Sequence, residues 1–185
     1  MDLTVEEHTS WSYGPRTFLN AGFSDLTVAF AVNFNTAGEI LTEKASKGRI
    51  IQFEIKEDFN AVNAARHLYL KMKNNNYKTL NIAGNGMHTF HAYGFDQFQI
   101  NEFIYRTLEP VHKHYGISKI RSGGQTGADI AGAVCAVLLD IPAIITYPAG
   151  FRQRLIDNSD VIQSKEAATD TIIRYADKLK EKLGI

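Results

Sequence analysis

Short apolar blocks that alternate with helix-like segments constrain the fold of this chain most. Leu26–Val32 is almost continuously apolar, as expected of a strand covered on both faces. Four similar blocks follow, so the expected strands are 26–32, 49–55, 79–84, 118–122 and 142–147. Apolar residues at helical spacing separate or follow them, within 33–48, 58–75, 96–109, 126–140 and about 165–183. This alternation predicts an α/β fold: a Rossmann-like three-layer sandwich in one domain, 1–185, with a mainly parallel sheet of about five strands.

Three regions fit this alternation less well. Residues 1–24 are polar and aromatic, with glycine and proline, which predicts irregular structure or a short helix. Residues 84–95 contain three glycines and two histidines and are expected to form a loop. Pro110 is expected to kink or end the helix that begins near Asp96, since proline lacks the backbone donor.

Composition excludes several classes of protein. Twenty basic residues balance twenty acidic ones, so the basic stripe of a duplex-DNA binder is missing. The single cysteine, Cys135, excludes an intramolecular disulfide and a multi-cysteine zinc site. No apolar run approaches the ~20 residues of a membrane span, and the first ten residues do not resemble a signal peptide. We therefore expect a cytoplasmic protein without a membrane partner.

The unusual loops all follow predicted strands. Ligands of parallel sheets bind at the carboxyl ends of the strands, near the point where the winding direction changes. Four loops are expected to share that edge, and they contribute the segments 33–39, 84–88, 122–129 and 147–154.

The loop Ser122–Gly127, with sequence SGGQTG, is the strongest candidate for a binding site. A helix begins inside it, so free N–H groups and the positive end of the helix dipole can accept a phosphate. Its glycines permit close approach to the backbone, and Asp129 can cap the helix or bind a ribose hydroxyl. The alternative is a tight turn without a ligand. The predicted contributors of the loop are Ser122, Gly123, Gly124, Gln125, Thr126, Gly127 and Asp129.

The other loops supply further candidates. Thr36 and Glu39 have the spacing of a capping box, and Glu39 can alternatively bind a ribose or act as an acid or base. His88 and His91 lack converging partners for a metal, so we expect a lid over a base or ribose, or an inert loop. Arginines 152 and 154 are candidates for a second phosphate. The remaining predicted ligand-binding residues are Asn33, Gly84, Asn85, Gly86, His88 and Arg152.

Two known phosphate motifs are excluded. No lysine follows the loop at Ser122–Gly127, so it is not a P-loop. The segment that begins at Gly84 has Thr89 where a dinucleotide-binding motif has its last glycine. We expect no cofactor and no metal.

The segment 120–150 resembles the molybdenum carrier family, whose hallmark is S-G-G-Q-T-G-x-D before a helix. That family belongs to the SLOG superfamily of Rossmann-like proteins, which includes the Lonely Guy phosphoribohydrolases, the DNA-processing protein A family and nucleotide sensors of antiviral systems. The segments 24–55 and 77–86 resemble parts that follow the glycine loop in the carriers, yet here they precede it. The resemblance therefore implies a circularly permuted SLOG domain, which close chain termini would permit.

The Lonely Guy motif P-G-G-x-G-T-x-x-E bears on catalysis. The matching residues 31–39 retain Thr36 and Glu39 but lack the proline and the motif glycines. The resemblance thus implies a binding protein for a nucleotide derivative, of the ADP-ribose or cyclic nucleotide type, as a sensor or sequestering sponge in antiviral signalling. The alternative is an N-glycosidase of nucleoside monophosphates that uses Glu39. DNA binding is disfavoured by charge, and oxyanion transport by the lack of a basic pocket.

Two further features concern partners and contacts. Aromatic residues of 88–95, or Trp11 and Tyr13, are candidates for stacking on a base. Helix 97–109 carries apolar residues on more than one side, which suits either a homodimer face or a helix buried in the monomer.

Overall fold

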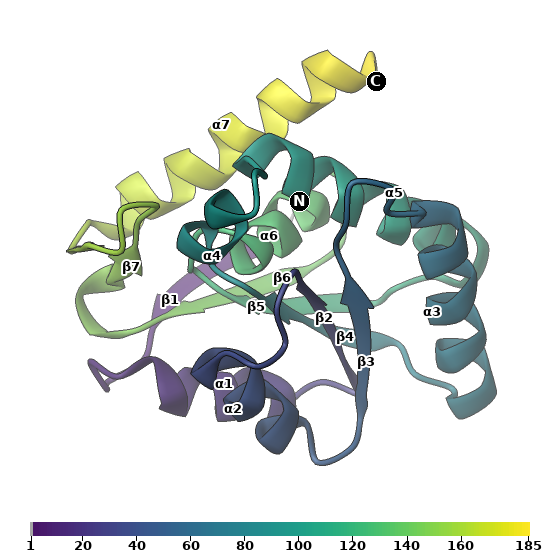
Figure 1. Ribbon diagram of the computed structural model, residues 1–185, viewed down its shortest axis with the longest axis horizontal. Helices are drawn as coiled ribbons and strands as arrows, with labels where there is room; N and C mark the ends of the chain where they lie inside the picture. Colours follow the sequence, from purple (N-terminus) through teal and green to yellow (C-terminus); the bar gives the residue numbers. More distant parts are fainter. Residues whose placement is uncertain (1) are drawn as a thin grey trace.

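A parallel six-stranded sheet forms the centre of the computed structural model, which describes residues 2–185 (Figure 1). The strand order is β1-β6-β5-β4-β2-β3, and every neighbouring pair is parallel. The strands are β1 (Leu3–Glu7), β2 (Leu26–Ala31), β3 (Ile50–Glu54), β4 (Thr79–Gly84), β5 (Lys119–Gly123) and β6 (Ala143–Tyr147). The predicted α/β architecture is confirmed, and the five predicted strands are β2 to β6.

Helices cover both faces of the sheet (Figure 1). Helices α1 (Tyr13–Gly22) and α2 (Ala37–Ser46) pack together on one face. The opposite face carries α3 (Ala61–Asn75), α5 (Gln97–Tyr115), α6 (Ala128–Leu138) and α7 (Lys165–Leu183). The short helix α4 (Met87–Ala92), the 3-10 turn Ala149–Phe151 and the antiparallel pair β7 (Gln153–Arg154) and β8 (Asp160–Val161) complete the chain.

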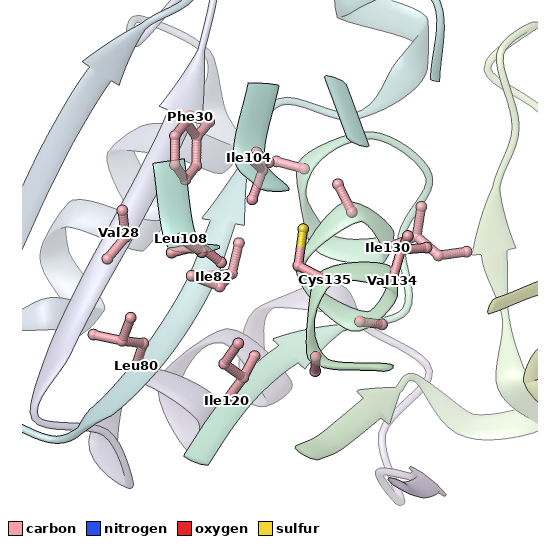
Figure 2. Close-up of a cluster of buried hydrophobic side chains, with 14 of the residues drawn as sticks. Val28, Phe30, Leu80, Ile82, Ile104, Leu108, Ile120, Ile130, Val134 and Cys135 are labelled. Atoms are coloured by element: carbon pink, nitrogen blue, oxygen red, sulfur yellow. The ribbon is translucent and has the colours of Figure 1, made fainter. Parts of the chain in front are cut away.

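The main core lies between the sheet and helices α5 and α6. Every residue of β2 is buried, which explains its unbroken apolar sequence. Figure 2 shows side chains of the strands meeting those of the two helices, among them Val28, Phe30, Leu80, Ile82, Ile104, Leu108, Ile120, Ile130, Val134 and Cys135. Cys135 is fully buried in this cluster, as expected of a small apolar residue.

The structure corrects the sequence prediction in three places. Strand β1 was not predicted; it pairs with β6 at the edge of the sheet, and its register from Leu3 to Glu7 is set by that neighbour. The predicted loop 84–95 contains α4, which Met87 and Phe90 anchor in the core. Helix α5 continues past Pro110 to Tyr115, because packing against α3 and α6 outweighs the missing backbone donor.

The apolar sides of α5 are largely covered within the chain. The Phe98 ring packs on Tyr175 of α7, and Phe103 packs between Phe59 and Phe95. Ile104 is fully buried. These contacts account for much of the apolar surface that also suggested a dimer, so the dimer stays a prediction.

Among the described residues, no helix has the length and apolar character needed to cross a membrane. The same part of the chain contains no group of three or more histidine, cysteine, aspartate or glutamate side chains suited to a metal ion.

Candidate functional site

A cavity of about 280 Å³ opens at the carboxyl ends of β2, β4 and β5. From β2 the chain continues to β3 on one side, whereas from β4 it continues to β5 on the other, so the winding direction changes between neighbouring strands. This is where parallel α/β sheets bind ligands. The cavity is lined from α1, from the segments after β2, β4 and β5, and from the segment Arg154–Asn158.

Asn85 joins the two loops at the change of direction. Its Oδ1 accepts hydrogen bonds from the backbone N–H groups of Val32 and Asn33, both at 3.0 Å. Its Nδ2 donates to the carbonyl oxygen of Asn33 at 3.1 Å. Only 2% of Asn85 is exposed. Its side chain therefore supplies the hydrogen bonds that water would otherwise make to the backbone of Val32 and Asn33. Asn85 therefore fixes the floor of the cavity.

A buried ion pair joins Arg16 of α1 to Asp129 of α6. Arg16 Nη1 lies 2.9 Å from Asp129 Oδ2, and the two side chains are only 8% and 10% exposed. Burial raises the pKa of Asp129, while the Arg16 guanidinium opposes that rise. Arg16 lines the cavity, and its Nε is buried without a hydrogen-bond partner in the part of the chain that the structure describes.

Glu39 lies in the first turn of α2, where Thr36 caps the helix by accepting from the Glu39 N–H at 3.3 Å. The residue is 4% exposed, and none of the described residues 2–185 forms a hydrogen bond with its Oε2. Burial, together with the nearby charge of Asp129, raises the pKa of Glu39 to about 8. Its carboxyl group is therefore mostly protonated at neutral pH. The backbone N–H of Glu39 takes part in the helix cap, while its side chain lines the cavity.

The glycines after β5 leave room for the protein's own side chains. A Cβ on Gly123 would overlap the Arg16 guanidinium, and one on Gly124 would overlap the Tyr147 ring. Gly127 has a φ of 98°, and a Cβ there would strike the backbone of Asn85 and Gly86. The need for glycine here is thus explained without a ligand.

Hydrogen-bond donors of this loop also have partners within the chain. The Gly127 N–H donates to Gln97 Oε1 at 2.6 Å, and the Ala128 N–H donates to the Asn85 carbonyl at 3.1 Å. The Ser122 hydroxyl lies 2.7 Å from the Ile82 carbonyl and 2.8 Å from that of Asp129, and Ser122 is fully buried. The N-terminus of α6 is therefore largely satisfied by protein groups.

Residues 153–161, here called the rim hairpin, close one side of the cavity. Gln153 Nε2 donates to the Gly124 carbonyl at 2.6 Å, and the Arg154 N–H donates to Gln125 Oε1 at 2.7 Å. The Thr126 hydroxyl donates to the Arg154 carbonyl, also at 2.7 Å. These bonds attach the rim hairpin to the glycine loop.

His88 of α4 also contacts the rim hairpin, at a different residue from those that bond to the glycine loop. Its Nδ1 lies 3.1 Å from the carbonyl oxygen of Ile156, and the ring is exposed at the rim of the cavity. Two side chains of the neighbouring segment do not face the ligand space: Phe90 is fully buried in the core, and Tyr93 is exposed away from the cavity lining. Of the aromatic candidates for stacking on a base, Tyr13 lines the cavity.

Most of the predicted ligand-binding residues come together. Those that line the cavity are Thr36, Glu39, Gly84, Asn85, Gly86, His88, Gly123, Gln125, Thr126 and Asp129. The predicted residues outside the lining are Asn33, Ser122, Gly124, Gly127 and Arg152. Arg152 instead pairs with Asp160, and its neighbour Arg154 reaches the cavity.

Sequence reasoning missed most of the contribution of α1. Tyr13, Arg16, Thr17 and Asn20 all line the cavity, and they follow the i, i+3, i+4, i+7 spacing of one helical face. That polar stripe was a readable signal. The glycine and proline of this segment, which favour irregular structure, obscure the helical spacing.

The chain matches no protein-family model and no curated protein sequence with which it was compared. The SLOG resemblance and the circular permutation therefore stay predictions, and the function is argued from the cavity.

Proposed function

We propose that this protein binds a small nucleotide-derived molecule in the cavity at the carboxyl ends of β2, β4 and β5. The observation that carries the proposal is the position of the cavity at the change in winding direction, where side chains from α1 and four loops converge. Its volume of about 280 Å³ lies just below the range for small-molecule sites, about 300–1,000 Å³, which suits a small ligand.

The lining suits a ligand rich in hydroxyl and amide groups. Carboxyl groups of Glu39 and Asp129, the guanidinium of Arg16 and the amide of Asn20 come together at its deep end. Ribose hydroxyls both donate and accept, so they match such a mixed set better than a purely apolar group does. At the outer end, polar side chains of Tyr13 and Arg154 line the cavity. A sensing or sequestering role in antiviral signalling follows from the SLOG resemblance alone and is part of the proposal.

One observation favours a second candidate, hydrolysis of an N-glycosidic bond. A carboxyl group that is protonated at neutral pH is suited to general-acid chemistry, and Glu39 has a pKa raised to about 8 inside the cavity. In this reaction, Glu39 would give its proton to the departing base as the bond to the sugar breaks. Water would supply the new oxygen bond, and its released proton would restore Glu39.

One experiment separates capture from cleavage. The protein is exposed to a nucleotide-rich cell extract, washed and heated, and the released small molecules are identified by mass spectrometry. We expect an intact nucleotide derivative near one equivalent per chain or per dimer. A free base with a sugar phosphate, missing when Glu39→Gln is used, would show cleavage instead. Glu43→Gln, an exposed carboxylate on the same helix, is the matched control. Release of no nucleotide-derived molecule would contradict both functions.

A further inference from the structure

Three arginines lie near the ring of Tyr13: Arg152 and Arg154 at the outer end of the cavity, and Arg16 on the side of the deep end. The guanidinium carbons of Arg152, Arg154 and Arg16 lie 4.8, 5.2 and 5.5 Å from the ring centroid. Two carboxylates pair with them, Asp129 with Arg16 and Asp160 with the other two. The three arginines and the two aspartates together thus carry a net charge of +1.

Several hydrogen-bond donors converge on the carboxylate of Asp160 in the rim hairpin. Its Oδ1 accepts from the Tyr13 hydroxyl at 2.7 Å and from Arg154 Nε at 3.1 Å. Its Oδ2 accepts from Arg154 Nη2 at 3.3 Å and lies 2.8 Å from Arg152 Nη2. Two guanidinium groups and a phenol converging on one anion are the donors that phosphate recognition uses.

The ion pairs of Asp160 are partly exposed to solvent, which weakens them. Its side chain is 27% exposed, so solvent screens both ion pairs. Tyr13 and Arg154 line the cavity itself, and Arg152 Nε is buried with no hydrogen-bond partner among the described residues. An anion at the outer end of the cavity can therefore reach Tyr13 and Arg154 in the lining and Arg152 beside them, and it can satisfy more of these donors than one carboxylate does.

The deep end of the cavity offers no comparable place for a phosphate. Arg16 is already neutralised by Asp129, and the carboxyl group of Glu39 lies beside that pair. The Gly127 and Ala128 amides at the start of α6 are bonded to Gln97 and Asn85. A phosphate is therefore disfavoured at the deep end and favoured at the arginines.

We propose that Tyr13, Arg152 and Arg154 form the anion subsite of the cavity, and that a phosphate group of the ligand displaces Asp160 from it. The orientation follows: the phosphate lies at the rim, and the hydroxyl-rich or basic part points toward Glu39 and Asp129. The proposal builds on nucleotide binding in this cavity, but the anion subsite is testable with a simpler probe.

The probe is inorganic pyrophosphate, titrated at constant ionic strength. Trp11 is the only tryptophan, and its carbonyl accepts from Arg152 Nη1 at 3.1 Å, so its fluorescence reports on the cluster. We expect Arg154→Gln to weaken binding by about tenfold or more, the usual effect of losing a charge-assisted hydrogen bond. We expect Asp160→Asn to strengthen it several-fold, because the internal competitor is gone.

The matched control is Asp157→Asn. Asp157 lies in the same rim hairpin, and its substitution makes the same change in net charge. Its carboxylate accepts from the N–H and the hydroxyl of Ser159, at 2.9 and 2.6 Å, instead of from the arginines. Asp160→Asn must therefore bind pyrophosphate more tightly than Asp157→Asn does. Equal or weaker binding overturns displacement, provided circular dichroism and thermal melting show both variants folded. If Asp160→Asn does not fold, an unchanged affinity in Arg154→Gln overturns the subsite.

The two proposals fail in different ways. Pyrophosphate binding in the expected order, without nucleotide capture from the extract, would keep the anion subsite and refute the nucleotide. Nucleotide capture that is unaffected by Arg154→Gln and Asp160→Asn would keep the function and refute the subsite.

Discussion

The same cavity holds arginine–aspartate pairs at its deep end and at its rim, and they differ in burial. Arg16 and Asp129 are 8% and 10% exposed, whereas Arg154 and Asp160 are 40% and 27% exposed. The deep pair is packed against Gly123 and cannot exchange its partners without disturbing the core. We expect the rim pairs to exchange their partners at a smaller cost in folding free energy, because partly exposed ion pairs contribute little to stability. Burial, rather than the type of residue, therefore distinguishes the deep pair from the rim pairs, at which we propose that a ligand replaces Asp160.

The largest expected effect is that of Asp129→Asn. Removing one partner leaves the Arg16 charge buried without compensation, which costs about 3–5 kcal/mol. Urea unfolding followed by circular dichroism measures the change in the free energy of unfolding. A loss below about 1 kcal/mol, the value typical of an exposed pair, would remove the contrast between the two ends.

Glu39→Gln tests the electrostatics of the deep end. The pKa of Glu39 is raised from 4.5 to about 8 on folding, so the folded protein holds this proton more tightly than the unfolded chain. The stabilisation is complete below pH 4.5 and is lost as pH rises through 8. The wild type should therefore lose stability relative to Glu39→Gln between pH 5 and 9, on the order of 3 kcal/mol.

Urea unfolding at several pH values measures this difference. Glu43→Gln, on the exposed side of α2, should retain the pH dependence of the wild type. If the free energies of unfolding of the wild type and Glu39→Gln changed equally with pH, Glu39 would not be the group that titrates in this range.

Gly123→Ala tests the packing beneath the deep pair. The new Cβ would overlap the Arg16 guanidinium and the Asp129 carboxylate, so the pair must shift. We expect a loss of about 1–3 kcal/mol, typical of overpacking in a buried region. Gly22→Ala is the control, because its Cβ would meet no atom within 4 Å. It should leave thermal stability unchanged or raise it slightly, and equal losses for both would argue against the packing explanation.

The smallest expected effect is that of Asp160→Asn on stability. Because its ion pairs are partly exposed, the free energy of unfolding should fall by less than about 1 kcal/mol. Thermal melting beside Asp129→Asn gives the comparison directly. A loss as large as that of Asp129→Asn would make the rim pairs structural and would leave Asp160 unable to exchange with a ligand.

The layers of the fold, and the edge of the sheet at which the site lies, can be predicted from the amino-acid sequence. Unbroken apolar blocks such as Leu26–Val32 predict buried parallel strands, because both faces of such strands are covered by helices. The position of Thr36, Glu39, Asn85 and Asp129 after their strands followed from the same rule. These are local properties, readable from the spacing of residues along the chain.

Which side chains fill the site depends on how distant segments pack. Arg16 and Asp129 are far apart in sequence, and nothing in either local pattern predicts that their side chains meet over Gly123. The glycines suggested room for a ligand, but that room holds the side chains of Arg16 and Tyr147. Strand β1 likewise gains its structure from pairing with β6. Such contacts depend on the packing of distant segments, and the spacing of residues along the chain does not encode them directly.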